Sequence, residues 1–311
     1  MWLVKAKPFF VLGSLAVLIQ AVSGWWDVFS HRIEFVDEDP LLNPAHVGLF
    51  AGVLLLSVSV SRKAGGPVRP SGLGLLRLFV IIQLMSGVAN EIIHRIPHLE
   101  AVLDFYIHSL FTLGMLLASL LLFVGASLSY LVTGRVGRDL VMLWSISMSG
   151  AALWLISSGS ILYLFHQNMT ATALMLGFIA SIILNTATAA SMRVGVAALT
   201  SATYFTASYL VLVLYAGVNP YPPSGPSTVL LVESMVALIA VKAGRVKTSL
   251  LSGGALYGLL TEIIYYPMLG RPWTVIEASM WGLIGGILGA LPILLLGGHI
   301  SQLYRSKIPV V

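Results

Sequence analysis

Two short stretches of the sequence carry imidazole, carboxylate and amide side chains at spacings suited to metal binding. In the first, Asp27 and His31 are four residues apart, and His46 follows after fourteen intervening residues. Side chains four residues apart project from the same face of an α-helix, so Asp27 and His31 can reach one point. With His46 from the next helix, three ligands can converge there, and the carboxylate of Asp37 lies close by in the sequence.

The second stretch repeats this arrangement with an amide in place of the first carboxylate. Asn90 and His94 are four residues apart, His108 follows after thirteen intervening residues, and Glu91 stands beside Asn90. The chain has no cysteine, which excludes disulfides and thiolate metal sites. Histidine-rich sites without thiolates suit copper or zinc, and carboxylates also admit iron or manganese.

The two stretches belong to an internal repeat. Residues 24–33 and 87–96 align from a glycine through the acid or amide to a His-Arg-Ile sequence, and residues 258–267 form a third copy with Thr261 and Tyr265 at the ligand positions. A degenerate copy spans 159–166. Repeated hairpins are common in membrane folds, and here they place polar residues at one depth.

The same residue pattern is compatible with two roles besides metal binding. A single Asp-x3-His pair at a helix end also occurs as a hydrogen-bonded pair at the membrane interface, without a metal. Histidines thirteen or fourteen residues apart can also be axial ligands of a haem, when both lie on one continuous helix. Pro40, Pro44 and Pro97 predict a loop within each histidine pair, which makes haem the less favoured cofactor.

The elements that position these residues are membrane helices. The 311 residues are 58% hydrophobic and 9% charged, whereas about a quarter of a soluble domain is charged. Apolar runs long enough to cross a bilayer recur along the chain, and they lack the alternation of barrel strands. We expect an all-α, polytopic bundle of about ten transmembrane helices. The predicted spans are 8–30, 45–61, 72–94, 101–133, 140–165, 170–192, 194–217, 227–243, 248–268 and 274–298.

The basic residues predict the orientation. With both termini in the cytoplasm, all Lys and Arg except Arg32, Arg95 and Arg271 lie on the cytoplasmic side, as the positive-inside rule requires. The helices then form five hairpins closed on the outside, and the metal site lies toward the extracytoplasmic side of a plasma membrane. The net charge of +5 is accounted for by topology and does not predict nucleic-acid binding.

The domain organisation follows from the same pattern. Residues 1–311 form one transmembrane domain, in which 20–125 are the metal-site hairpins and 140–311 are additional transmembrane helices. The stretch 255–280 holds the degenerate third repeat, with Glu277 near the place of the second histidine.

The two motifs resemble those of a known family. Asp27-x3-His31, Asp37 and Pro44-x-His46, followed by Asn90-Glu91-x2-His94 and His108, resemble the motifs of the C subunit of copper membrane monooxygenases, the particulate methane and ammonia monooxygenase family. The resemblance covers residues 20–125.

The resemblance implies two neighbouring copper sites within the membrane. The matching ligands are Asp27, His31 and His46 for one site and Asn90, His94 and His108 for the other, with Glu91 and Asp37 behind them. It also implies dioxygen activation and substrate hydroxylation with electrons from a quinol, in a complex with other subunits.

Two further classes of function remain as alternatives. The chain could be a non-catalytic membrane anchor subunit of a respiratory or electron-transfer complex, binding haem or quinone. It could also be a transporter built from pseudo-repeated hairpins.

Overall fold

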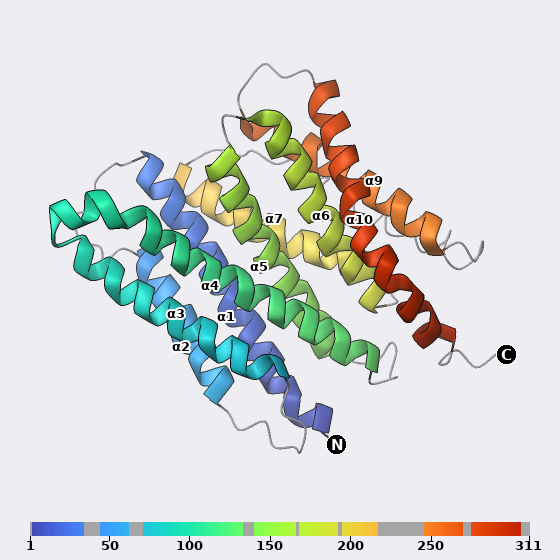
Figure 1. Cartoon of the computed structure of the whole chain (residues 1–311), viewed down its shortest axis with the longest axis horizontal. Coiled ribbons are helices and arrows are strands. Elements are labelled where there is room, and N and C mark those ends of the chain that lie inside the picture. The colour runs from blue at the N-terminus through green and yellow to red at the C-terminus, as the bar shows by residue number, and fades with distance from the viewer. Residues whose placement is uncertain are drawn as a thin grey trace.

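The computed structural model is a bundle of long α-helices (Figure 1). It describes residues 2–33, 44–61, 71–132, 140–165, 168–191, 195–216, 246–269 and 275–305, and these ranges contain nine helices and no strand. The helices are α1 (Trp2–Ile33), α2 (Pro44–Ser61), α3 (Ser71–Ile93), α4 (Pro97–Val132), α5 (Leu140–Phe165), α6 (Met169–Ser191), α7 (Val196–Ala216), α9 (Val246–Leu269) and α10 (Val275–Arg305).

Seven of these helices contain segments long and apolar enough to cross a membrane. They are parts of α1 to α6 and of α10, and α9 contains a shorter apolar segment, Leu250–Leu260. The predicted all-helical, multi-pass membrane protein is therefore confirmed. The predicted span 227–243 lies outside the described residues, so the count of ten and the orientation stay predictions.

Prolines set two of the helix boundaries. Pro44 begins α2 and Pro97 begins α4, four residues before the predicted start at 101. Proline is well suited to the first helical position, because its φ is already helical and the amide hydrogen it lacks would have no partner within the helix. The turn between α3 and α4 is consequently short, and it occupies residues 94–96.

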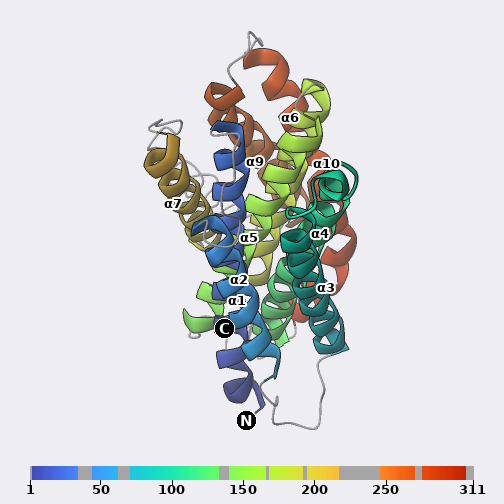
Figure 2. The ribbon, with the colours of Figure 1, turned by 90° about the vertical axis from the view of Figure 1, so that its left-hand side faces the viewer.

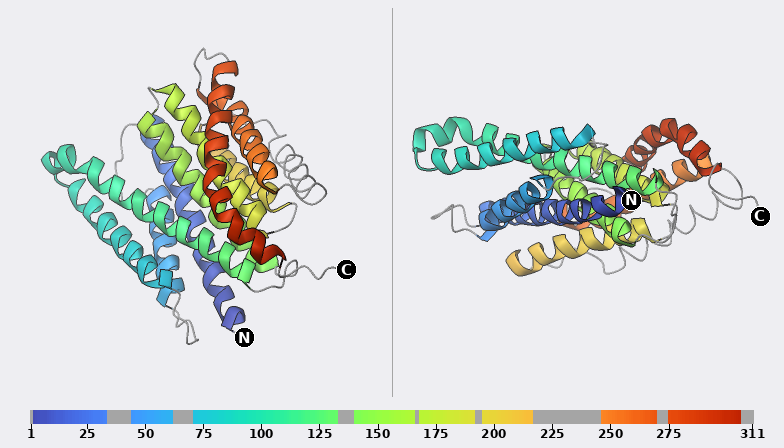
Figure 3. Two further views of the ribbon diagram at one scale, coloured as in Figure 1. Left: turned by 45° about the vertical axis from the view of Figure 1, so that its right-hand side comes forward. Right: turned by 90° about the horizontal axis from the view of Figure 1, so that it is seen from below.

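The helices pack in two groups around α5. In the first group α1 packs against α2 and α3 against α4, with further contacts between α1 and α4 and between α2 and α3. Seen from below, α3 and α4 form one layer and α1 and α2 the next (Figure 3). The second group consists of α6, α9 and α10. Helix α5 contacts α1, α4, α6 and α7, and 83% of its apolar segment is buried.

Aromatic side chains fix α5 to its neighbours. The indole nitrogen of Trp25 on α1 donates a hydrogen bond of 2.6 Å to the carbonyl oxygen of Leu155 on α5. On another face of α5, Trp154 stacks on Tyr204 of α7 with ring centroids 4.2 Å apart. Helix α7 thus lies at one edge of the bundle, with α3 and α4 at the opposite edge (Figure 2).

Glycines bring α6, α9 and α10 into close contact. A Cβ atom at Gly258 of α9 would overlap the carbonyl oxygen of Gly282 on α10, and one at Gly254 would overlap that of Gly286. The hydroxyl of Ser181 on α6 donates a hydrogen bond of 2.6 Å to the same Gly286 oxygen. Small residues of this kind let membrane helices approach closely, where van der Waals contact drives association.

Replacing Gly258 with alanine should therefore destabilise the bundle. The added methyl group has to displace the α10 backbone, and overpacking of this kind costs about 1–3 kcal/mol. We expect a lower melting temperature in detergent for Gly258→Ala. The control is Gly74→Ala on α3, where nothing lies within 4 Å of the new Cβ and alanine favours the helix by about 1 kcal/mol. Equal melting temperatures for the two variants would contradict the close packing.

Candidate metal-binding site

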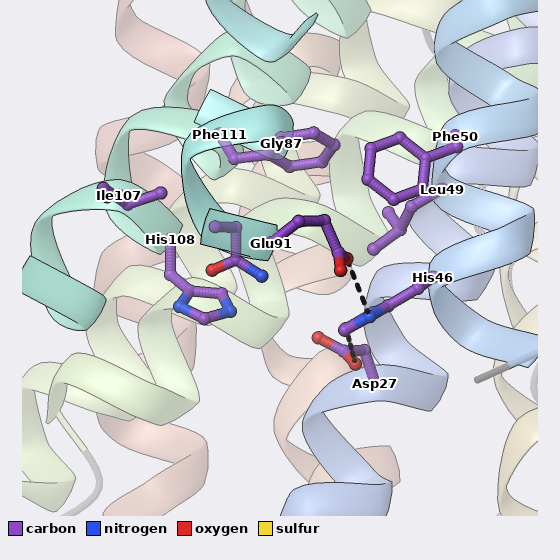
Figure 4. Close-up of a pocket in the computed structure, with 10 residues that line it drawn as sticks. Asp27, His46, Leu49, Phe50, Gly87, Glu91, Ile107, His108 and Phe111 are labelled. Atoms are coloured by element: carbon purple, nitrogen blue, oxygen red, sulfur yellow. Dashed lines mark ion pairs between the residues drawn. The ribbon is translucent and has the colours of Figure 1, made fainter. Parts of the chain in front are cut away.

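A small cavity lies among the first four helices, and each of them contributes a polar side chain to its wall. Asp27 comes from α1, His46 from α2, Asn90 and Glu91 from α3, and His108 from α4. The cavity offers about 40 Å³ to the centres of water molecules, which is room for a metal ion and a small ligand. Figure 4 shows the labelled polar side chains around a common space.

The rest of the cavity wall is apolar. Leu49 and Phe50 of α2 and Phe111 of α4 line it beside the polar groups. A wall of this kind excludes bulk water and strengthens electrostatic interactions within the cavity. It also gives small apolar molecules a favourable surface next to the polar groups.

The first predicted ligand set is brought together in part. The Nε2 atom of His46 lies 3.0 Å from Oδ1 of Asp27, and both side chains are buried. On the other side of the ring, Nδ1 of His46 lies 3.7 Å from Oε1 of Glu91. The imidazole therefore stands between two carboxylates, and dashed lines mark both pairs in Figure 4.

Two other predicted residues of this set cannot be placed. His31 belongs to the last turn of α1, but its side chain lies outside the described part of the structure. Asp37 lies outside the described residues altogether.

The most compact group of possible ligands among the described residues contains His94 and His108 of the second set, with Asp104 in place of Asn90. Asp104 Oδ1 lies 2.9 Å from Nδ1 of His108 and 3.8 Å from Nε2 of His94, and the two imidazole rings are 6.0 Å apart between centroids. One ligand atom from each of these three residues lies within 4.8 Å of the other two. Two ligand atoms on opposite sides of a metal at about 2.1 Å are about 4.2 Å apart, so a small contraction would close this set on an ion.

The sequence analysis did not place Asp104 among the ligands. One feature of the sequence could have indicated Asp104, namely its spacing from a histidine. Asp104 and His108 are four residues apart on α4, as Asp27 and His31 are on α1. The predicted amide ligand, Asn90, lines the cavity, and its buried Oδ1 makes no hydrogen bond with the described residues. Asn90 is thus available to the cavity, while Asp104 occupies the position between the two histidines.

Helix α4 begins at Pro97, so His108 lies three turns inside it, one turn deeper than the predicted start at 101 implies. The predicted break between His94 and His108 is present as the turn at 94–96, and His31 and His46 also lie on different helices. Neither pair shows the single continuous helix that the haem hypothesis requires.

The two sets differ in their access to the surroundings. The side chain of His46 is 5% exposed and that of Asp27 is 11% exposed, whereas those of His108 and Asp104 are 38% and 43% exposed. His108 lines the cavity and is partly exposed, so its side of the cavity is the more open one, through which an ion could enter, and Asp104 lies beside it. His98, at the start of α4, is exposed and does not line the cavity.

Acidic groups gather in the cavity and beside it. Asp27 and Glu91 line the cavity, Asp104 lies next to His108, and neither oxygen of Glu91 accepts a hydrogen bond from the described residues. Ionisable groups at membrane depth are expensive and need partners, and a divalent cation is an effective one. The arrangement can bind a cation through imidazole nitrogens and carboxylate oxygens.

Replacing Asp104 with asparagine should weaken cation binding at the open side of the cavity. The change keeps the size of the side chain but removes the negative charge between His94 and His108. We expect the affinity of the purified protein for Zn²⁺ or Cu²⁺ to fall by at least about tenfold, measured by titration against a competing chelator. Glu277→Gln, at an exposed carboxylate of α10, is the control and should bind as the unmodified protein does. Unchanged affinity in Asp104→Asn would remove Asp104 from the site.

Comparisons with known proteins add no assignment to this geometry. No protein-family model, no curated protein and no solved structure matches the chain.

Proposed function

We propose that the chain is a copper-binding integral membrane subunit of a larger complex, with its copper site in the cavity of α1 to α4. One observation carries the proposal. Two motifs far apart in the sequence, each with an acid or amide and histidines at helical spacing, contribute Asp27, His46, Asn90 and His108 to one cavity. If polar residues were distributed at random in a membrane protein, the two motifs would not be expected to meet at one cavity.

The donor atoms favour copper over harder cations. His46, His94 and His108 offer neutral imidazoles, Asp27 and Asp104 offer carboxylates, and the chain has no thiolate. Imidazole ligands suit copper and zinc, whereas Mg²⁺ and Ca²⁺ prefer an all-oxygen set. Copper(II) is also the divalent ion that a given nitrogen and oxygen site binds most tightly.

The residues divide into two neighbouring ligand sets. His94, Asp104 and His108 would bind one ion at the open side, and Asp27 and His46, with His31 by resemblance, would bind a second at the buried side. Glu91 faces Nδ1 of His46 and would keep the metal-binding Nε2 free of its proton by accepting a hydrogen bond from Nδ1. Asn90 lies on the cavity wall and can complete either set.

The reaction follows from the family resemblance alone. A copper membrane monooxygenase activates dioxygen on copper and hydroxylates a substrate with quinol electrons. In this chain the apolar wall of Leu49, Phe50 and Phe111 would hold a small apolar molecule beside the ligands and exclude bulk water.

The proposed topology has ten spans with the site on the extracytoplasmic side of the plasma membrane. Helix α1 begins and α10 ends at the same end of the bundle, as an even number of spans requires (Figure 1). Helices α7 and α9 run in the same direction, so an odd number of crossings is needed between them, and 227–243 is the apolar run available there. The distribution of basic residues places the cavity end outside.

Metal analysis of the purified protein tests the proposal directly. We expect bound copper in stoichiometric amount and a Cu(II) electron paramagnetic resonance spectrum with nitrogen hyperfine coupling. His46→Ala and His108→Ala should each lose at least half of the copper, because each removes an imidazole from a different set. His98→Ala is the matched control, since it removes an exposed imidazole outside the cavity and should retain all of the copper.

Two outcomes would contradict the copper proposal. A haem Soret band without copper would favour the anchor subunit of an electron-transfer complex. Absence of both metals after supplementation of the growth medium would leave a membrane protein of another class, such as a transporter.

A further inference from the structure

The similarity between the first two hairpins extends below the cavity. Residues 17–33 and 80–96 are identical at eight of 17 positions, and the shared residues include Gln20 with Gln83 and Ser23 with Ser86. Each hairpin also has a glycine six residues after its second histidine, Gly52 after His46 and Gly114 after His108. The two hairpins therefore repeat a polar pattern that runs two helical turns beyond the metal ligands.

The structure shows the same packing around both glutamines. Gln20 and Gln83 are 0% exposed. A Cβ atom at Gly52 of α2 would meet Cγ of Gln20, and a Cβ atom at Gly114 of α4 would meet Cγ of Gln83. In each hairpin, the absence of a side chain on one helix makes room for a buried amide from the other.

These amides continue the polar face that carries the cavity residues. Gln20, Ser23 and Asp27 are spaced i, i+3 and i+7 on α1, as Gln83, Ser86 and Asn90 are on α3, so each trio follows one face of its helix. Seven residues of α-helix span about 10 Å. Ser23 and Ser86 are buried as well, so on each helix a face of polar side chains runs from the cavity residue to a buried glutamine.

Neither the nitrogen nor the oxygen of Gln20 or Gln83 makes a hydrogen bond with the described residues. A buried amide without a hydrogen bond is strongly unfavourable, and buried water is the usual partner of such groups. Two glutamines at matching positions thus point to a built site for water.

The other repeats in the chain provide an internal comparison. Counted from the shared glycine, the position of Gln20 and Gln83 is Leu155 in the degenerate copy and Gly254 in the third copy. Neither of those copies carries the acid or amide together with the histidine. The buried glutamine therefore accompanies the ligand pattern, and where that pattern is lost the position serves helix packing, as Gly254 does against Gly286.

We propose that Gln20 and Gln83 bind water about 10 Å along the helices from Asp27 and Asn90, and that Ser23 and Ser86 connect this water to the cavity as a path for protons. Imidazole and carboxylate groups exchange protons when they bind or release a cation, and lipid offers no route for those protons. The path would supply that exchange. The proposal concerns the hydration of the bundle and does not depend on which cation the cavity holds.

Cysteine accessibility tests the bound water, because the chain has no cysteine of its own. Gln20→Cys and Gln83→Cys are compared with Ala21→Cys and Val80→Cys, which replace buried apolar residues at similar depth on the same helices. We expect a small charged methanethiosulfonate reagent to modify the glutamine-position cysteines at least ten times faster than the controls, because only hydrated thiols ionise and react. Equal rates at the glutamine and control positions would overturn the proposal.

A second measurement tests the alternative that water enters the cysteine variants only because cysteine is smaller than glutamine. Gln20→Leu and Gln83→Leu fill the space with apolar side chains. If the native amides are dry, removing them relieves buried unpaired groups, so a raised melting temperature in both variants would overturn the proposal. If the amides hold water, we expect the melting temperature to stay the same or fall. Both measurements use the metal-free full chain, so their failure would leave the copper proposal standing.

Discussion

Lipid cannot solvate a charged side chain, and this constraint governs the arrangement of the first four helices. The imidazole of His46 stands between Asp27 and Glu91, and Asp104 stands between His94 and His108. Asp27, His46 and Glu91 are mostly buried, so removing one of them would leave its partners uncompensated, and these three side chains have to be treated as one electrostatic unit.

The remaining helices support this unit by packing closely against one another and against α1 and α4. Glycine contacts among α6, α9 and α10 allow close backbone approach, and Ser181 ties α6 to α10 through the Gly286 carbonyl. Helix α5 connects that group to the site, because it packs against α6 and accepts, at the Leu155 carbonyl, a hydrogen bond from the Trp25 indole two residues before Asp27. The polar hairpins are thus packed against a group of helices held together by small residues.

The sequence predicted much of this arrangement for identifiable reasons. Hydropathy alone predicts the helices, because a spanning segment must satisfy its own backbone hydrogen bonds. Helical spacing and repetition indicated Asp27, His46, Asn90 and His108 as candidates, and the structure places all four on one cavity. Asp104 was not among the predicted ligands because it falls outside the aligned repeat, and His108 lies one turn deeper in its helix than predicted because Pro97 begins α4 early. Pairing between helices, such as Asp104 with His94, depends on how the helices pack, and a single sequence does not report it.

The two hairpins share a pattern but are not equivalent, and the difference bears on how two cations could occupy one cavity. The first hairpin has Asp27 where the second has Asn90, while the second has Glu91 where the first has Val28 and Asp104 where the first has Leu42. The acids of the second hairpin do not all serve its own histidines, since Glu91 faces His46 of the first. A carboxylate therefore lies on each side of His46, and another lies between His94 and His108. Two neighbouring cations would repel one another strongly in a low-dielectric cavity, and negative charge distributed in this way would offset that repulsion at both proposed positions.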